Sequence, residues 1–246
     1  MAKHEQILLT DADCLPNSDT WGVKMLKNVC NNEDIVLGIS HYFHKKGFLN
    51  FFIRYETLNT MLNYLTFALS GMPYMGVGRN LSYSKSTFFK SNGFDDIEGI
   101  VGGDDDLLIQ KISKNNKVNI CIEKDAICYS KPETKLLSYL KQKKRHLSVG
   151  KKYKQKFKVL LSLDLASNIL FYVLFLFFMI NDKLSTLLFI IFLCKLIISS
   201  IITYSAKIKT HAKISFLEIA VMDFLNSFIT SILGMYSILA KNKRWN

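Results

Sequence analysis

The stretch QILLTDAD, from Gln6 to Asp13, decides how the fold is interpreted: a short apolar run ends in two carboxylates that are one residue apart. The run has the length and composition of a buried strand in a parallel sheet. Alternate residues of an extended segment point the same way, so Asp11 and Asp13 can face one ligand at the end of that strand. Two hard oxygen donors in this place suit Mg²⁺ or Mn²⁺. A solvated turn after a strand is the alternative interpretation of the same residues.

The composition of the chain changes at about Lys158. The 246 residues carry a net charge of +12 and are 49% hydrophobic, which is too apolar and too basic for an ordinary soluble domain. Residues before this point resemble a globular domain with a polar surface and glycine turns, whereas Leu, Ile and Phe dominate the rest. We therefore expect two parts, a globular α/β domain over residues 1–158 and a membrane domain over residues 159–246.

Three segments of the second part are long enough and apolar enough to cross a bilayer, which takes about 20 residues. They are expected near residues 159–180, 184–206 and 216–240. The third segment is the most polar of the three, so a re-entrant or interfacial helix is an alternative to a full span. In the first part, the aromatic stretch from Phe48 to Tyr55 is compatible with a strand or with an interfacial segment near the membrane.

Basic residues flank the first of these segments. Residues 141–158 contain nine Lys and Arg, and further lysines follow the second segment. Cytoplasmic loops carry such an excess, so we expect an integral protein of the inner or plasma membrane with a cytoplasmic globular domain. Lysines in this place touch membrane lipids. Nucleic acid is not an expected partner, because the charge sits against the membrane and is not spread over a face with interleaved aromatic residues.

One lysine lies near the centre of the second apolar segment. An unpaired charge there is costly, so Lys195 is expected to face the interior of the helices and to have a partner. If the second and third segments run in opposite directions, Asp223 lies about one helical turn from it, within reach of a lysine side chain. Asp164 is the other candidate partner.

A second acidic cluster lies in the globular part. Asp104, Asp105 and Asp106 follow a Gly-Gly turn and precede an apolar run that predicts an amphipathic helix. One aspartate can cap this helix, and acidic residues stabilise a helix N-terminus. Another can act as a general base beside a bound metal.

A third element precedes the membrane segments. Gln142 and Arg145 are three residues apart, so a helix places both on one face. An amide and a guanidinium group on one face can hold a diphosphate or a leaving oxyanion.

In this order the elements resemble the membrane-bound glycosyltransferases of family 2, which have the GT-A fold. The family's D-x-D motif corresponds to Asp11-Ala12-Asp13, its acidic catalytic motif to Gly103–Leu107, and its Q-x-x-R-W motif to Gln142–His146. The stretch from Gly76 to Phe94 is similar to the family's acceptor-side segment, a strand followed by a helix and a Gly-Phe turn. The resemblance covers about residues 5–158.

The resemblance implies an inverting transfer of a sugar from a nucleotide-diphospho-sugar to a hydroxyl group of a lipid-linked or cell-envelope glycan acceptor. Asp13 would hold the divalent metal on the diphosphate, and Asp11 would contact the ribose or a metal-bound water. Asp104 would be the general base, with Asp105 as the alternative in a shifted register. Gln142 and Arg145 would hold the diphosphate.

The acceptor side would include Gly78, Arg79, Asn80 and His146. The last of these stands where the family has a tryptophan, which argues against a processive polymerase.

The resemblance begins part-way through the family's fold. Its first strands and nucleotide-binding half precede the D-x-D motif, and only ten residues precede Asp11 here. We therefore expect the C-terminal part of a GT-A domain, completed by a separately encoded N-terminal half if it is active. The alternative is a truncated, non-catalytic remnant that acts as a membrane interaction protein.

Overall fold

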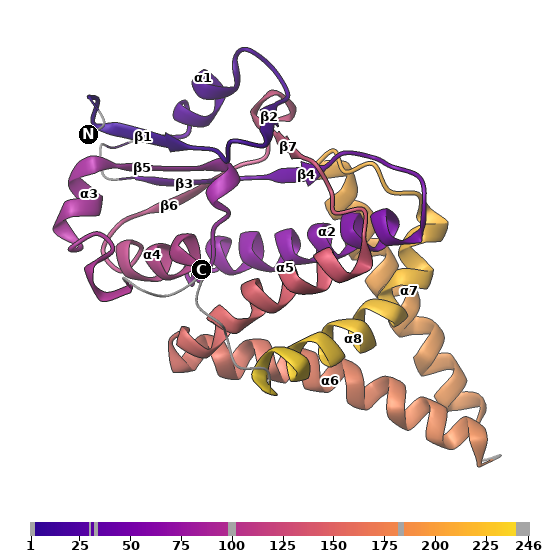
Figure 1. Cartoon of the computed structure of the whole chain (residues 1–246). Helices are drawn as coiled ribbons and strands as arrows, with labels where there is room; N and C mark the ends of the chain where they lie inside the picture. The colour runs from indigo at the N-terminus through magenta and orange to yellow at the C-terminus, as the bar shows by residue number, and fades with distance from the viewer. Residues whose placement is uncertain (1–2, 30, 32–33, 98–101, 182–184, 240–246) are drawn as a thin grey trace.

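The computed structural model describes residues 3–29, 31, 34–97, 102–181 and 185–239. The part before residue 150 is an α/β domain built on two small sheets, and long helices extend from it (Figure 1).

The larger sheet has four strands in the order β1-β5-β3-β6, which are Gln6–Leu9, Leu81–Ser84, Ile35–Gly38 and Val118–Cys121. β5 pairs antiparallel with both β1 and β3, and β3 pairs parallel with β6. The expectation that β1 is a buried strand with parallel neighbours is wrong, because β1 is a half-buried edge strand of this sheet. Three strands still run in one direction, so the carboxyl ends of β1, β3 and β6 share one edge.

The smaller sheet continues from that edge. Its strands are β2 (Cys14–Pro16), β7 (Cys128–Ser130) and β4 (Ser40–Tyr42), in the order β2-β7-β4. β7 pairs antiparallel with β2 and parallel with β4. Each of these strands directly follows a segment that leaves the larger sheet, so the junction of the two sheets lies next to Asp11 and Asp13.

Two helices cover one face of the larger sheet, and α1 (Trp21–Leu26) lies on the other side (Figure 1). The longer, α2 (Phe48–Leu69), contains no Gly or Pro and lies between Gly47 and Gly71, both with positive φ angles. The stretch Phe48–Tyr55 is therefore helical and not a strand, and its position near the membrane interface stays a prediction. The second helix is α4 (Asp104–Ile112).

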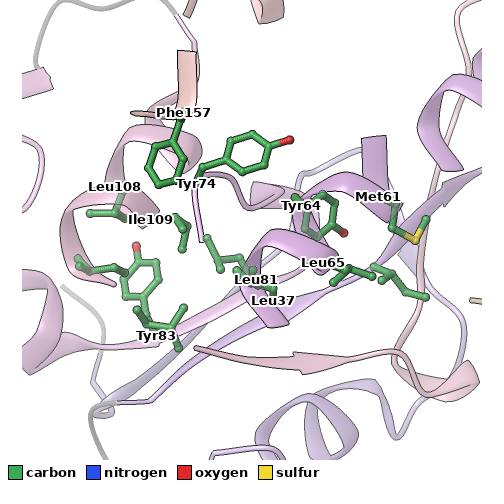
Figure 2. Packing of buried hydrophobic residues seen from close by; sticks show 14 of the residues in the cluster. Leu37, Met61, Tyr64, Leu65, Tyr74, Leu81, Tyr83, Leu108, Ile109 and Phe157 are labelled. Atoms are coloured by element: carbon green, nitrogen blue, oxygen red, sulfur yellow. The ribbon is translucent and has the colours of Figure 1, made fainter. Parts of the chain in front are cut away.

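The main core lies between this sheet face and its helices (Figure 2). Leu37 and Leu81 of the sheet are almost fully buried against Met61 and Tyr64 of α2 and Ile109 of α4. The Tyr64 hydroxyl donates a hydrogen bond of 2.9 Å to the Gly38 carbonyl oxygen, so this aromatic ring is buried without an unsatisfied polar atom. The core fixes α4, and with it the acidic cluster, against the sheet.

The other segments match several expectations. After β5 come α3 (Lys85–Lys90) and the Gly93–Phe94 turn, the strand, helix and turn predicted for this stretch. Gln142 and Arg145 lie in α5 (Leu136–Val149), as their spacing predicts.

Among the described residues, two helices are long and apolar enough to cross a membrane, by length and composition. They are α6 (Gln155–Ile180) and α7 (Thr186–Lys209), and most of their apolar side chains are exposed. The rings of Phe175 and Phe192 stack with centroids 3.9 Å apart, which joins the two helices as an antiparallel hairpin.

The third expected segment forms α8 (Phe216–Leu239). Within its described residues the apolar stretch is shorter, Val221–Leu233. Figure 1 shows α8 between α5 and α6, and it also contacts α2 and α7. A full span and a re-entrant or interfacial helix therefore both stay predictions for this segment.

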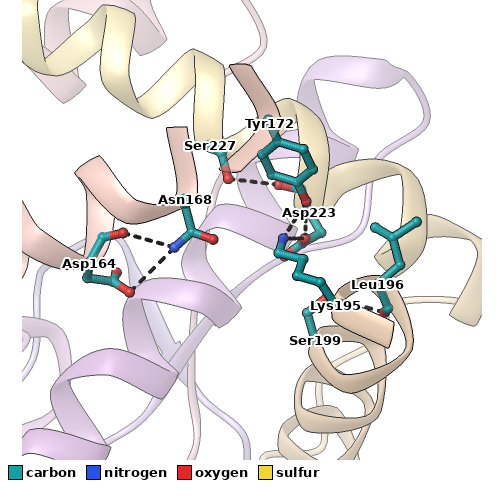
Figure 3. Close-up of polar contacts among 8 residues, drawn as sticks. All are labelled: Asp164, Asn168, Tyr172, Lys195, Leu196, Ser199, Asp223 and Ser227. Carbon is teal, nitrogen blue, oxygen red and sulfur yellow. Dashed lines mark hydrogen bonds and ion pairs between the residues drawn. The ribbon is translucent and has the colours of Figure 1, made fainter. Parts of the chain in front are cut away.

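The expected pairing of Lys195 is confirmed. Its ammonium group forms an ion pair with the carboxylate of Asp223 on α8 and contacts the hydroxyl of Tyr172 on α6 (Figure 3). The Tyr172 hydroxyl also donates to the same carboxylate oxygen at 2.5 Å. Asp164 instead accepts hydrogen bonds from Asn168 of its own helix. The cluster therefore joins α6, α7 and α8 through one set of polar contacts.

Candidate active site

The two carboxylates of the opening stretch lie exposed at the junction of the sheets. Asp11 and Asp13 form a group with Cys14 in which the possible ligand atoms all lie within 4.8 Å of one another. The Cys14 thiol is buried against the Ser130 hydroxyl, 3.0 Å away, and burial raises its pKa. The thiol therefore stays protonated at neutral pH, and the charged donors of the group are the two carboxylates.

These donors fit a hard divalent cation. Mg²⁺ is commonly held by one or two carboxylates together with phosphate oxygens, and Asp11 and Asp13 leave room for such oxygens because both are exposed. A neutral thiol is a poor ligand for Mg²⁺ or Mn²⁺. Asp11 and Asp13 are thus the residues that could hold the metal.

The three aspartates of the second cluster have three different environments. All lie in the first turn of α4, where the helix dipole favours acidic groups. Asp104 is exposed, Asp105 is half-buried and Asp106 is buried. The residue at the cap position is Gly103, with a φ of 73°, so the expectation that an aspartate caps this helix is wrong. A left-handed cap is reached most easily by glycine, which is why the Gly-Gly turn precedes the cluster.

Asp105 is held by the backbone of the acceptor-side segment. The Gly78 N–H donates a hydrogen bond of 2.8 Å to Asp105 Oδ2, and the Asp106 N–H donates to Oδ1 at 3.0 Å. Burial raises the pKa of this carboxyl, and the hydrogen bond from Gly78 opposes the rise. Both oxygens of Asp105 are therefore engaged, whereas Asp104 faces solvent.

Asp106 contacts the residues just before α6. The Tyr153 hydroxyl donates a short hydrogen bond to Asp106 Oδ2, and Lys154 contacts Gln110 of α4 with its backbone N–H, 3.1 Å from Oε1. Burial raises the pKa of Asp106 well above its ordinary value. The sequence does not predict this contact between α4 and the residues before α6, because Asp106 and Tyr153 are 47 residues apart and no motif connects them.

Helix α5 packs against the Gly-Gly turn. A Cβ atom on Gly102 would lie 3.2 Å from Cγ of Arg145, and one on Gly103 would lie 2.3 Å from Cγ1 of Val149. Arg145 and Val149 are four residues apart, so one face of α5 fits into the space that the two glycines leave open. The Q-x-x-R helix and the acidic cluster are thereby brought together.

Charges from all of these elements act on Asp11. Partial burial raises its pKa, the negative charges of Asp13 and Asp104 raise it further, and the positive charges of Arg79 and Arg145 oppose the rise. Charges from segments that are more than 130 residues apart in the chain therefore act on this one carboxylate.

The acceptor-side residues have separate places. The Arg79 guanidinium donates to the Ser130 hydroxyl at 3.0 Å and lies 4.8 Å from the centre of the Tyr42 ring. Asn80 is completely buried, and its amide donates to the carbonyl oxygens of Ile39 and Ala126 at 2.7 Å each. Asn80 thus joins the residue between β3 and β4 to the turn that precedes β7, while Arg79 contacts β7 itself. Neither Ser130 nor Tyr42 could be identified as a neighbour of Arg79 from the sequence.

The remaining predicted residues lie on α5. Gln142 is half-buried, three residues before Arg145 on the same helix. His146 is exposed, and the surrounding protein and then the positive charges of Lys143, Arg145 and Arg79 lower its pKa. The imidazole thus lies within the positive field of Lys143, Arg145 and Arg79.

Comparison with sequence profiles of known families matched the family described as Glycosyl transferase family group 2, over residues 8–233. The match includes the D-x-D pair, the acidic cluster, the Q-x-x-R helix and both apolar helices.

The chain belongs to this family. Glycosyl transfer is accordingly the reaction class that family membership supports, with a nucleotide-sugar donor and a glycan acceptor as the substrates that the family implies. A search of curated proteins found no match.

Proposed function

We propose that the chain is a membrane-bound inverting glycosyltransferase. It moves a sugar from a nucleotide-diphospho-sugar to a hydroxyl group of a lipid-linked or cell-envelope glycan acceptor. The observation that carries the proposal is the convergence on Asp11, where Asp13, Asp104, Arg79 and Arg145 all contribute to the electrostatic field.

The residues divide into two groups by charge. Asp11 and Asp13 would hold a divalent metal, which would offset the negative charge of the donor diphosphate. Arg145, whose charge acts on Asp11, and Gln142 on the same helix hold the diphosphate as it leaves. Arg79 adds a second positive charge on the side of the smaller sheet.

Asp104 supplies the general base. It is the exposed member of its cluster, whereas Asp105 is bound by Gly78 and Asp106 by Tyr153. Asp104 accepts the proton of the acceptor hydroxyl while the oxygen forms a bond to the anomeric carbon. The bond from that carbon to the diphosphate oxygen breaks, its electron pair leaves with the nucleoside diphosphate, and the configuration at the carbon inverts.

The membrane placement follows from the hairpin of α6 and α7. The first residues of α6 and the last of α7 lie at the end nearest the sheets, and both ends are basic. The positive-inside rule then places the α/β domain in the cytoplasm. An acceptor that is bound to the membrane would reach the site from the same side.

A turnover assay tests the proposal. The full chain in lipid nanodiscs is given radiolabelled UDP-sugars and GDP-sugars, Mn²⁺ and lipid extract, and label in the lipid or glycan fraction is counted. Asp104→Asn is expected to lower the rate by about 10²- to 10⁴-fold, the usual contribution of a general base. Asp125→Asn, at an exposed residue on another segment, is the matched control and should leave the rate unchanged.

Label transfer that survives Asp104→Asn would contradict the assignment of the base. No transfer by the wild-type chain with any donor would favour the non-catalytic membrane protein instead.

A further inference from the structure

A cavity opens where the smaller sheet meets the end of α7. Its volume is about 310 Å³, and residues of β2, β4, α2 and the loop after α7 line it. A second hollow of about 400 Å³ adjoins it and shares His44 and Arg54. The proposed transfer reaction makes no use of this space.

The lining of both hollows is cationic. Arg54, Lys213 and the imidazoles of His44 and His211 line the first, and Lys45 and Lys46 line the second. None of the described lining residues is an Asp or Glu. The charged side chains of this lining, those of Lys213, Lys45, Lys46 and Arg54, have one sign, so an anion in the cavity is attracted by their combined field.

The pKa of His41, a buried residue in the wall of the first cavity, is affected by these positive charges. Burial lowers the pKa of His41 to about 4, and the positive charges of Arg79, His211 and Arg54 act in the same direction. Its Nε2–H donates a hydrogen bond of 2.7 Å to the Thr210 carbonyl oxygen, which fixes the loop after α7 to β4. The neutral imidazole of His41 thus holds the wall of the cavity in place, and the positive charge comes from the neighbouring side chains.

The basic loop before α2 is also held in a defined shape. Buried Asn50 accepts a hydrogen bond of 2.8 Å from the Lys45 N–H and donates one of 3.1 Å to the Phe43 carbonyl oxygen. His44, Lys45 and Lys46 remain exposed at the rim. The loop leads into the N-terminus of α2, whose first turn carries no acidic residue, so the helix dipole adds to the positive potential.

Aromatic rings line the rest of the cavity. Phe43 stacks on Tyr129 with ring centroids 5.4 Å apart, and Tyr42 lies between the cavity and the Arg79 guanidinium. Metal binding by the histidines is not favoured, because among the described residues only Asp11, Asp13 and Cys14 bring three ligand atoms close together. A group of cations beside apolar rings, at the end of an apolar helix, suits an anion attached to an apolar body.

We infer that this cavity is a binding site for a phosphate-type anion, either the headgroup of a membrane lipid or a free phosphate or diphosphate. A guanidinium and an ammonium group can together contact several oxygen atoms of one anion. A phosphate group offers more such oxygens than a carboxylate does, so it is the better ligand for this pair. The inference does not depend on the transfer reaction, because binding here needs neither the donor nor the aspartates.

Calorimetric titration of the full chain in neutral detergent tests the inference. One arm uses inorganic pyrophosphate, a second uses short-chain phosphatidic acid, and short-chain phosphatidylcholine gives the baseline. The variant is His44→Gln with Lys213→Gln, two exposed positions where glutamine is tolerated. The matched control is His4→Gln with Lys114→Gln, which makes the same two changes at exposed positions elsewhere.

We expect wild-type chain and control to bind at least one phosphate probe, and the cavity variant to bind it about tenfold more weakly, as lost charge-assisted hydrogen bonds predict. Comparable binding of both probes would identify the phosphate group as the ligand, and binding of phosphatidic acid alone would identify a lipid. Absence of binding to both probes would overturn the inference. So would equal affinity of variant and wild type, or equal weakening of variant and control at equal melting temperature.

Discussion

The backbone N–H of Gly78 donates a 2.8 Å hydrogen bond to the carboxylate of Asp105, so the acceptor-side segment and the acidic cluster are joined by direct contact. A Cβ on Gly78 would lie 3.5 Å from the same oxygen, which means that the backbone approaches the carboxylate closely. This contact distinguishes two neighbouring aspartates: Asp105 is bound to the backbone of another segment, whereas Asp104 is exposed, as the proposed general base requires.

Asp105→Ala should therefore lower stability more than a surface substitution does. The change leaves the Gly78 N–H without its acceptor, which costs about 1–3 kcal/mol. Thermal unfolding in detergent measures this loss of stability, with Asp125→Ala, at an exposed position, as the control. Equal melting temperatures for the two variants would show that the hydrogen bond has no structural role.

Gly103→Ala should disturb the contact between α4 and α5. The added Cβ would lie 2.3 Å from Val149 Cγ1, and the residue has a φ of 73°. Overpacking of this kind costs about 1–3 kcal/mol. Adding Val149→Ala removes the two closest atoms, Cγ1 and Cγ2, but leaves Val149 Cβ at 2.7 Å and the backbone strain, so the double variant should recover only part of the lost melting temperature. A double variant that is less stable than Gly103→Ala alone would refute the clash as the cause.

A single substitution in the ion pair of Lys195 and Asp223 should lower the stability of the protein, and a second substitution that exchanges the two charges should restore part of it. The side chains are only 22% and 19% exposed, so Lys195→Asp leaves buried like charges and should cost about 3–5 kcal/mol. Adding Asp223→Lys restores opposite charges and should recover part of the melting temperature and of the membrane expression. If the double variant is no better than the single one, the pair does not hold α7 to α8.

Asp106 should make stability depend on pH. Burial raises its pKa well above the ordinary value of 3.8, so the folded state keeps a proton that the unfolded state loses. This contribution is fully present below about pH 4 and is lost as pH rises through the folded pKa, at up to about 1.4 kcal/mol per pH unit. Asp106→Asn has no such proton, so its melting temperature should fall less across this range. Parallel curves for both proteins would assign the dependence to other groups.

The local patterns in the sequence predicted much of the candidate site. A strand that ends in Asp11 and Asp13, a Gly-Gly turn before an acidic helix, and a helix with Gln142 and Arg145 on one face are each properties of a short segment. Local spacing determines such features. The Lys195 pairing followed from the cost of an isolated charge among apolar helices, which leaves few possible partners.

The arrangement of these segments could not be predicted from such patterns. The antiparallel pairing of β1 with β5 joins residues that are more than 70 positions apart, and a four-residue apolar run has the same composition in either kind of sheet. The packing of α8 beside α5 and α2 depends on their combined surfaces. The roles of Asp105 and Asp106 depend on Gly78 and Tyr153, which no spacing rule connects to them.

The most direct test of the central claim is calorimetric titration of UDP-sugars and GDP-sugars into the wild-type chain and Asp13→Ala, with and without Mn²⁺. The account predicts that the wild-type chain binds a nucleotide-sugar only when Mn²⁺ is present, and that Asp13→Ala loses this binding. Asp19→Ala, at another exposed aspartate of the same region, should bind as the wild type does. Binding that is independent of Mn²⁺ and unchanged in Asp13→Ala, or no binding of any nucleotide-sugar, would contradict it.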